Sequence, residues 1–245
     1  MSLDWGVVRD DQLAPVVRPP EPFDLAPAQD KPSRLKRIVI VLIALPILLS
    51  ALYAFVPPVS TLMLARWATL RPVERDWVPL SQISPNLPRA VIAAEDGFFC
   101  SHWGVDWGAM REVFSDTWLP DRGASTVTMQ VAKNLFLWQG AGYVRKPIEI
   151  ALAHWLELTW TKRRIMEVYL NIAEWGPNGV FGAEAASQRA FHKPASALSA
   201  REASILAAAL PNPIVRNTAR PGPRLSRRAG RILGMDGDAS CLDRY

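Results

Sequence analysis

Cysteine and histidine are scarce in this chain, and neither is spaced as a metal site requires. The 245 residues include two cysteines, Cys100 and Cys241, and three histidines. No CxxC or HExxH sequence occurs, so we expect no zinc site. The two cysteines lie far apart, and the sequence does not decide whether they form a disulfide.

Nucleotide-binding motifs and internal repeats are missing as well. The chain contains neither GxGxxG nor a Walker sequence, which removes the usual phosphate-binding loops of nucleotide enzymes. We expect no organic cofactor. With 49% hydrophobic residues, the chain is long enough for one good-sized domain with its own core.

One long uncharged run is present. Residues 38–56, IVIVLIALPILLSALYAFV, are long enough to cross a hydrocarbon layer of about 30 Å. A buried core helix or a cleaved signal peptide explains the run less well, because it is long and no A-x-A-like site follows it. Four cations crowd its N-terminal side: Lys31, Arg34, Lys36 and Arg37. The positive-inside rule then predicts a cytoplasmic N-terminus and an external position for everything after about residue 57.

The segments beside this run carry no motif. Residues 1–30 contain prolines and scattered acids without a helical or strand period, so we predict a disordered cytoplasmic tail. Residues 31–56 form the basic flank and the transmembrane helix. Residues 57–75 are either a stretch resting on the membrane surface or the first helix of the domain. We assign the domain itself to residues 76–245.

The net charge of +5 indicates an anionic partner. A membrane-anchored domain outside the cytoplasm rarely meets nucleic acid, so anionic lipid or a phosphorylated substrate fits better. Five arginines near the end share one face if the segment after Pro223 is helical. A solvated face is the more common explanation, and anionic headgroups are the alternative. These arginines are Arg220, Arg224, Arg227, Arg228 and Arg231.

Apolar residues recur at a spacing of three and four through most of the domain, which predicts an almost entirely helical fold. No segment shows a convincing strand alternation, and clusters such as WGPNG and LPNP separate the helices. The predicted helical segments are 87–99, 126–138, 146–171, 180–191 and 199–209.

The first of these segments, VIAAEDGFFCSHWG at residues 91–104, carries a Glu-Asp pair into a cluster of aromatics. On a continuous helix, Glu95 would be flanked by Val91 and Ile92 one turn before it and by Phe98 and Phe99 one turn after it. Such burial raises a carboxyl pKa toward the range of a general base near neutrality. On residue types alone, an ion pair or a loop cap formed by Glu95 or Asp96 explains the pair slightly better.

Two further stretches are suited to an anion. In GASTVTMQVAKN, residues 123–134, Ser125 or Thr126 can cap a helix whose free N–H groups attract anions, and Gln130, Lys133 and Asn134 project nearby. An ordinary N-cap explains this stretch as well.

In RKPIE, a proline is suited to a first helical turn, and Arg145, Lys146 and Glu149 can cluster. Cations at a helix N-terminus oppose the macrodipole, which hints at a bound anion such as diphosphate. A surface salt bridge is about equally plausible.

Together these stretches resemble the successive motifs of the peptidoglycan glycosyltransferase family. The match covers AAEDGFFCSHWG, GASTVTMQVAKN, RKPIE and the run from RRIMEVYLN to LPNP, in order and spacing, over roughly residues 75–215. The chain is most similar to monofunctional biosynthetic peptidoglycan transglycosylases, which share this domain with class A penicillin-binding proteins, and a transpeptidase domain is not expected. The resemblance implies a mostly α-helical, lysozyme-like bilobed domain.

The resemblance also implies a reaction: polymerisation of lipid II into glycan strands with release of undecaprenyl diphosphate. Glu95 would be the general base that deprotonates the acceptor sugar 4-hydroxyl, which attacks the donor anomeric carbon with inversion. Glu149 would assist at the diphosphate, directly or through Mg or Mn, and Lys133, Arg145 and Lys146 would neutralise the leaving group. The remaining motif positions would shape or line the cleft: Asp96, Phe99, His102, Gly104, Ser125, Thr126, Gln130 and Asn134.

The family further implies a bacterial inner-membrane protein with a periplasmic catalytic domain. Its partners would be lipid II, the growing glycan strand, and proteins of cell-wall synthesis or division. Three positions depart from the family pattern: Met129 replaces a glutamine, Ala141 an arginine and Ala190 an aromatic residue. The first two bear on donor diphosphate contacts and the third on packing near the cleft.

Two other functions compete with this interpretation. A membrane-bound muramidase or lytic transglycosylase would also use a glutamate, and paired carboxylates alone do not separate it from a synthase. A non-catalytic scaffold that binds lipid II or synthesis partners is the other. Glu95 and Glu149 on one cleft would favour catalysis over the scaffold.

Overall fold

The computed structural model describes residues 1–2, 33–115, 125–140 and 142–243 of the chain. Contacts divide the chain into two units, Met1–Val41 and Leu42–Tyr245. The predicted tail over residues 3–30, the loop residues Gly123 and Ala124, and the departure at Ala141 lie outside the described residues.

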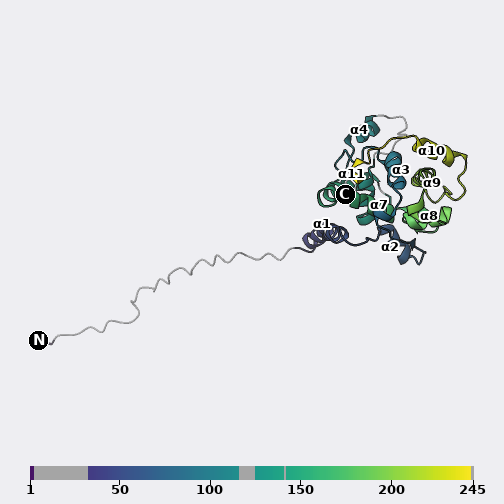
Figure 1. Cartoon of the computed structure of the whole chain (residues 1–245). Coiled ribbons are helices and arrows are strands. Elements are labelled where there is room, and N and C mark those ends of the chain that lie inside the picture. The colour runs from purple at the N-terminus through teal and green to yellow at the C-terminus, as the bar shows by residue number, and fades with distance from the viewer. Residues whose placement is uncertain (3–32, 116–124, 141, 244–245) are drawn as a thin grey trace. The chain divides into compact units, whose positions relative to one another are not determined.

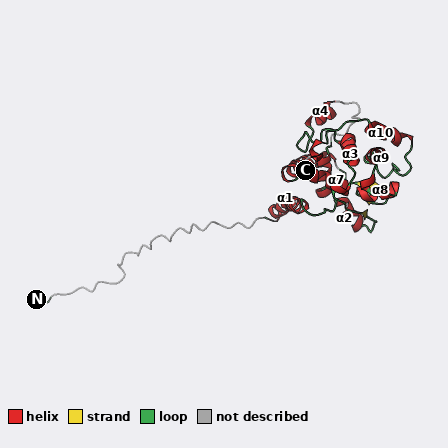
Figure 2. Cartoon of the chain, in the orientation of Figure 1, coloured by secondary structure: helices red, strands yellow, loops and turns green. Residues whose placement is uncertain are grey.

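Helices dominate the described part of the chain, as Figure 2 shows, and the mostly α-helical fold class predicted from the sequence is confirmed. The helices, several of them labelled in Figure 1, are α1 (Arg34–Tyr53), α2 (Thr61–Ala68), α3 (Asn86–Glu95), α4 (Trp107–Ser115), α5 (Val127–Phe136), α6 (Gly142–Thr159), α7 (Lys162–Ile172), α8 (Ala183–Phe191), α9 (Ala200–Ala209), α10 (Pro223–Leu233) and α11 (Ser240–Asp243). Short 3-10 turns occupy Leu80–Gln82 and Ala195–Ala197.

Helix α1 is the one helix in the described residues that is long and apolar enough to cross a membrane, by length and composition. Its last turn is fixed to the domain by hydrogen bonds. Ser50 Oγ accepts from Trp155 Nε1 (2.7 Å), and the Ser50 carbonyl accepts from Trp160 Nε1 (3.0 Å). Arg164 also donates to the Tyr53 carbonyl (2.8 Å). The end of α1 is therefore bonded directly to α6, to Trp160 just after it, and to α7.

Residues 57–75, which the sequence left between two interpretations, are packed into the domain. Met63 on α2 is 1% exposed. Thr61 Oγ1 donates to the carbonyls of Asn134 (3.1 Å) and Leu137 (2.7 Å) at the end of α5. Helix α2 of this segment thus packs on the C-terminal end of α5, while Leu64, Trp67 and Leu70 are exposed.

The hydrophobic core lies between helices that come from distant parts of the sequence. Helix α5 packs against α6 and α7, while α9 packs against α3 and α10. The largest fully buried side chains include Trp175, Tyr169, Phe99 and Phe181. Burial of each such side chain stabilises the fold by roughly 1.5–3 kcal/mol, so these contacts fix the relative positions of α3, α5 and α7.

A small sheet that the apolar pattern did not predict accompanies the helices. The strands are β1 (Glu74–Arg75), β2 (Glu174–Gly176) and β3 (Val180–Phe181), in the order β1-β3-β2. β1 runs parallel to β3, and β2 runs antiparallel to it. Strands of two or three residues are too short to show an alternating pattern. The helix predicted over 180–191 accordingly begins later, at Ala183.

The helix predicted over residues 87–99 is also too long, because α3 ends at Glu95. Asp96 has φ −158° and ψ 68°, which takes the chain out of the helix. Phe98 and Phe99 therefore do not lie one turn beyond Glu95 on the same helix. Phe99 is buried in the core, whereas Phe98 is 61% exposed.

The predicted helix over residues 146–171 is in fact two helices. α6 ends at Thr159 and α7 begins at Lys162, because Thr161 Oγ1 accepts from the backbone N–H of Arg164 (3.2 Å) and caps α7. Pro147 lies inside α6 instead of in its first turn. Arg145 and Lys146 are thus the fourth and fifth residues of α6, where the N-terminal dipole opposes them less strongly than it would at the first residue.

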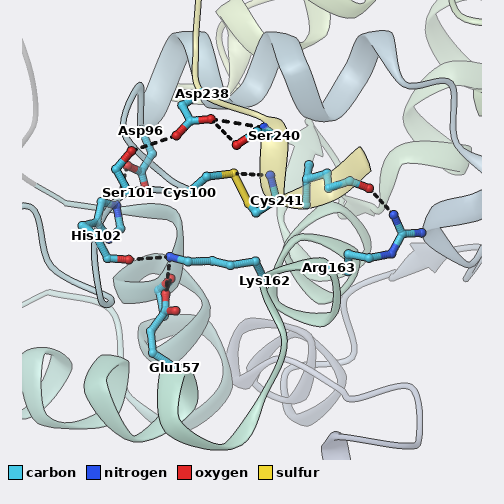
Figure 3. Close-up of a disulfide and its surroundings, with 12 residues drawn as sticks. Asp96, Cys100, Ser101, His102, Glu157, Lys162, Arg163, Asp238, Ser240 and Cys241 are labelled. Carbon is cyan, nitrogen blue, oxygen red and sulfur yellow. Dashed lines mark hydrogen bonds and ion pairs between the residues drawn. A yellow bond between two sulfur atoms is a disulfide. The ribbon is translucent and has the colours of Figure 1, made fainter. Parts of the chain in front are cut away.

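A disulfide joins Cys100 to Cys241, which answers the question that the sequence left open. Figure 3 shows the bond linking the turn after α3 to the last described helix, α11. Disulfides form and persist in oxidising compartments. The bond therefore agrees with the position outside the cytoplasm that the charge distribution predicts.

The buried side chain of Asn171 fastens α7 to the segment before α3. Its amide donates to the carbonyls of Val78 (2.9 Å) and Glu167 (2.8 Å), and its oxygen accepts from the Val78 N–H (3.0 Å). The residue is fully buried. Both backbone groups of Val78 thus depend on this one side chain.

We predict that Asn171→Leu destabilises the domain by about 2–4 kcal/mol, because two buried backbone groups lose their partners. Thermal unfolding of the detergent-solubilised chain, followed by circular dichroism, measures the change. Gln82→Ala at an exposed position is the control and should unfold as the wild type does. An Asn171→Leu protein as stable as the wild type would contradict the assigned role.

Candidate functional site

Glu95 is the last residue of α3, and its carboxylate is largely shielded from water, with the side chain 15% exposed. Gln130 Nε2 of α5 donates to Glu95 Oε2 (3.2 Å). Arg228 Nη2 of α10 lies 3.8 Å from the other oxygen, Oε1. The carboxylate therefore lies where α3, α5 and α10 come together.

Burial raises the pKa of Glu95 above its ordinary value of 4.5. The hydrogen bond from Gln130 and the charges of Arg228, Arg216 and Lys133 all lower that pKa, but burial is the larger effect. A carboxylate whose pKa is moved toward neutrality is suited to accept a proton from a hydroxyl group. The partial burial predicted from Val91 and Ile92 is thus present, although α5 and α10 complete it.

Asp96, the next residue, is buried and joins two elements. One carboxylate oxygen lies 2.8 Å from His102 Nε2, and the other accepts from the backbone N–H of Val127 (2.8 Å), the first residue of α5. A carboxylate at this helix end is also favoured by the macrodipole. Asp96 therefore joins His102 and the end of α3 to the start of α5.

The start of α5 is held against the same turn. Thr126 Oγ1 donates to the Gly104 carbonyl (2.6 Å) and accepts from the Met129 N–H (3.1 Å), so Thr126 is the N-cap. A Cβ atom on Gly104, which has φ +78°, would lie 2.9 Å from the Ala153 carbonyl oxygen. Only glycine allows this approach to α6. Thr126 is buried, and its hydroxyl is occupied within the protein, so we do not expect it to contact a substrate.

A second group of charges surrounds the buried carboxylate of Glu149 on α6. Arg145 Nη1 lies 3.0 Å from Glu149 Oε1, and Lys146 Nζ lies 3.7 Å from Oε2. The clustering of these three residues predicted from their spacing is confirmed. Within the described part of the chain, the buried Nε of Arg145 has no hydrogen-bond partner. A buried guanidinium donor without a partner is suited to a bound anion.

Lys133 lies between the two glutamates. Burial lowers the pKa of Lys133 below 10.5, and the charges that act on it include both Glu149 and Glu95. Burial likewise lowers the pKa of Lys146. A partly desolvated ammonium group attracts an anion more strongly than one in water does.

Polar contacts connect one glutamate to the other. Gln130, bonded to Glu95, also approaches the Ser125 carbonyl (3.5 Å), and Lys146 Nζ donates to Ser125 Oγ (3.4 Å). Lys146 in turn pairs with Glu149. The structure thus brings Glu95, Gln130, Ser125, Lys133, Arg145, Lys146 and Glu149 into one connected site. Asn134 is joined to Thr61 through its carbonyl, and no described contact joins it to either glutamate.

The donor set at Glu149 does not suit a divalent metal. Mg²⁺ and Mn²⁺ prefer several oxygen ligands, whereas Glu149 is a single buried carboxylate facing two cations. Among the described residues, no group of three or more His, Cys, Asp or Glu is placed to hold an ion. We therefore derive no step through a metal.

Sequence reasoning missed three residues at Glu95. Arg216 and Arg228 lower its pKa, and its charge in turn helps to raise the pKa of Tyr169 well above the ordinary value. The hydroxyl of Tyr169 donates to Gln130 Oε1 (3.1 Å) and fixes the amide that faces Glu95. Among the patterns noted in the sequence, only the arginine stripe near the end of the chain contained one of these residues, Arg228. Arg224, Arg227 and Arg231 are exposed, whereas Arg228 turns toward Glu95.

Met129, which stands where the family pattern has a glutamine, is a packing residue. This corrects the expectation that the position affects contacts with the donor diphosphate. Met129 is fully buried in a small apolar cluster with Val105, Met110 and Ala153. A glutamine there would have to bury its amide. Ala190 is partly buried against the main core.

A cavity of about 330 Å³ lies beside the turn after α3, lined by Phe98, His102, Trp103, Trp107 and His154 among others. It contains neither glutamate. Residues 116–124, which directly precede Ser125 in the sequence, lie outside the described residues. We therefore place the site by its contacts and not by this cavity.

Comparison with known proteins agrees with the geometry. The family model described as Transglycosylase matches residues 63–235. A protein named "Biosynthetic peptidoglycan transglycosylase" from Rhodopseudomonas palustris (strain TIE-1) is 54% identical over 202 residues, which cover 80% of this chain and 86% of the relative. The protein of the same name from Agrobacterium fabrum is 52% identical over 204 residues, covering 80% and 90%.

A third relative of that name, from Nitrobacter winogradskyi, is 51% identical over 194 residues, covering 78% of this chain and 86% of its own length. The matches extend over the whole set of elements that build the site, from α2 to α10. The chain therefore belongs to the transglycosylase family and is a glycosyltransferase enzyme.

Proposed function

We propose that the protein polymerises lipid II into the glycan strands of peptidoglycan and releases undecaprenyl diphosphate. The observation that carries the proposal is the Glu95 carboxylate, whose pKa is raised by burial although three cations act on it. The relatives named for peptidoglycan transglycosylation support the substrate class.

In the proposed reaction, Glu95 takes the proton from the acceptor sugar 4-hydroxyl. The freed oxygen attacks the anomeric carbon of the donor strand, the bond to the diphosphate breaks, and the configuration inverts. Gln130 holds one oxygen of Glu95 in place, and Tyr169 holds Gln130. These bonds fix the base before the substrate binds, which reduces the reorganisation needed in the transition state.

The leaving diphosphate would bind at the second group of charges. Arg145 has an unpartnered Nε, and Lys133 and Lys146 are partly desolvated ammonium groups. Glu149 neutralises part of their mutual repulsion and orients Arg145. Negative charge that develops on the diphosphate as the bond breaks would therefore be stabilised by donors already in position.

We further propose that α1 anchors the protein in the bacterial inner membrane with the N-terminus in the cytoplasm and the domain in the periplasm. The apolar helix and the cations Arg34, Lys36 and Arg37 at its start support this orientation. The disulfide between Cys100 and Cys241 supports an oxidising compartment for the domain. The bonds from Trp155, Trp160 and Arg164 to the end of α1 would keep the domain close to its lipid-linked substrate.

The rival functions differ in their products. A muramidase or lytic transglycosylase would shorten preformed glycan, and a scaffold would give no product. The cations that connect Glu95 to Glu149 favour synthesis, because hydrolysis of a finished glycan involves no diphosphate. The polar contacts that run from Glu95 through Gln130, Ser125 and Lys146 to Glu149 also support catalysis over a scaffold.

We predict that Glu95→Gln abolishes polymer formation from labelled lipid II, with a loss of about 10²–10⁴-fold in rate, because glutamine cannot accept the proton. Detergent-solubilised protein is incubated with the substrate, and the products are separated by length with and without muramidase. Wild-type product should be long and sensitive to muramidase.

The matched control is Glu74→Gln, which alters an exposed carboxylate paired with Arg189 (2.7 Å) far from the site in sequence. It should retain wild-type activity. Shortened chains from preformed glycan, without new polymer, would establish the hydrolase instead. If folded wild-type protein gives neither product, the non-catalytic scaffold is the remaining interpretation.

We predict a bell-shaped dependence of kcat on pH. Glu95 must be deprotonated, and burial raises its pKa, so activity should rise with pH through a midpoint above 4.5. Lys133 must be protonated, and burial lowers its pKa, so activity should fall again at a midpoint below 10.5. Initial rates of lipid II polymerisation across this range measure both midpoints.

The Lys133→Arg variant distinguishes the acid side of this pH profile from its alkaline side. Arginine keeps its charge at high pH, so the fall in activity that deprotonation of Lys133 causes should disappear, while the acid midpoint stays near the wild-type value. If Lys133→Arg instead moves the acid midpoint and leaves the upper midpoint unchanged, Glu95 and Lys133 have been assigned to the wrong sides of the profile.

A further inference from the structure

The last described residues, 237–243, cross the turn that follows Glu95, and we call them the C-terminal strap. The backbone N–H of Asp238 donates to the Gly97 carbonyl (3.0 Å), and Ser101 Oγ donates to Asp238 Oδ2 (2.8 Å). Cys241 is bonded to Cys100, and its N–H also donates to Cys100 Sγ (3.1 Å). Figure 3 shows the contact between Ser101 and Asp238 and the two contacts between Cys100 and Cys241.

The strap is itself anchored to the body of the domain. The Leu242 carbonyl accepts from Arg163 of α7, and Asp243 pairs with Arg89 of α3 (3.3 Å). A Cβ atom on Gly237 would lie 2.8 Å from Ile92 Cγ2 and 3.0 Å from the Ala93 nitrogen. The strap therefore lies directly on the last turn of α3, the turn that ends in Glu95.

The turn over residues 96–104 has an inner and an outer side. On the inner side, Asp96 is bonded to α5, Phe99 is buried, and the His102 carbonyl accepts from Lys162 Nζ (2.8 Å). Lys162 is fixed in turn by the buried carboxylate of Glu157 (2.8 Å). These contacts do not involve the strap.

The outer side depends on the strap. Gly97 and Ser101 are exposed and Cys100 is half-buried. Cys100 packs against the main core, but the hydrogen bonds and the covalent bond that join these three residues to other described elements come from Asp238 and Cys241. The hydrogen bonds at Gly97 and Ser101 are partly open to water and individually weak, so the disulfide is the one strong restraint on the outer side.

We propose that the C-terminal strap is a positioning element for Glu95, and that the Cys100–Cys241 bond places glycosyl transfer under thiol–disulfide control. This inference rests on the proposed role of Glu95. With the bond closed, the turn holds the end of α3 and keeps Glu95 against Gln130. With the bond open, the outer side is released and the base loses its fixed position, while the cations on α5 and α6 keep theirs.

The switching step is a two-electron exchange with a dithiol reductant. One thiolate of the reductant attacks one sulfur of the Cys100–Cys241 bond and forms a mixed disulfide. The second reductant thiolate then displaces that sulfur, so the reductant is oxidised to a disulfide and both cysteines become thiols. The bond forms only in an oxidising compartment, so the base would acquire its position after the domain has left the cytoplasm.

The first measurement compares the oxidised and dithiol-reduced full chain in detergent with labelled lipid II. Reduction should lower kcat by about tenfold to a hundredfold, as small misplacements of a reacting group do. KM should stay within about twofold, because the diphosphate-binding cations are untouched. Reoxidation should restore kcat.

The chain has two cysteines in all, so the Cys100→Ser/Cys241→Ser double variant is a matched control. It should have the kcat of the reduced wild type and should not respond to the reductant. Gly237→Ala lifts the strap from α3 with the disulfide retained, and it should lower kcat in the same manner. Arg189→Ala, which breaks an exposed ion pair outside the strap, should change neither parameter.

A second measurement does not depend on activity. Hydrogen exchange of the peptide spanning residues 96–104 should speed up on reduction, while the far-UV circular dichroism and the exchange of α5 stay unchanged. Failure of the proposed function would appear as oxidised wild-type protein without polymer, whatever the exchange result. Unchanged kcat and exchange on reduction, or a general loss of helix, would overturn the strap proposal.

Discussion

The arrangement of the site depends on one buried carboxylate, that of Asp96. Its two oxygens are used by His102 and by the first N–H of α5, so α3 has to end just before it and α5 has to begin beside it. Burial of a carboxylate is costly, and two short hydrogen bonds, one of them at a helix N-terminus, offset the cost. Because Asp96 fixes this junction, Glu95 at the end of α3 faces Gln130 one turn into α5.

Opposing effects act on Glu95, and their balance decides its chemistry. Burial raises its pKa, while Gln130 and the cations lower it. Without the cations, burial would raise the pKa of Glu95 further and leave less of it in the carboxylate form that accepts a proton. Without the burial, its pKa would be lower and the carboxylate would be a weaker base. The cations come from three separate elements, α5, α10 and the segment after α9. Therefore no single helix sets the basicity of Glu95.

The sequence predicted those parts of the fold and site that depend on local contacts. The apolar spacing gave α3, α5, α8 and α9 to within a few residues, and Arg145, Lys146 and Glu149 cluster because they share a helical turn. It failed where a short local feature interrupts the apolar pattern and where distant segments decide. Thr161 ends one helix and starts another through its cap, the sheet strands are too short to alternate, and Arg228 approaches Glu95 only once α10 has packed on α9 and α9 on α3. The disulfide likewise depends on a long-range approach that spacing does not encode.

The end of the chain completes what the earlier motifs begin. The motifs over residues 91–149 supply Glu95 and the cations on α5 and α6, but Arg216, Arg228 and the strap all come from the segment after α9. These late residues act on Glu95 in two ways: the arginines lower its pKa through their charge, and the strap lies on the last turn of α3 and is bonded to the turn at Gly97. The surroundings of Glu95 are therefore complete only in a domain whose C-terminal segment has docked, whereas the contacts among Arg145, Lys146 and Glu149 form within α6 alone.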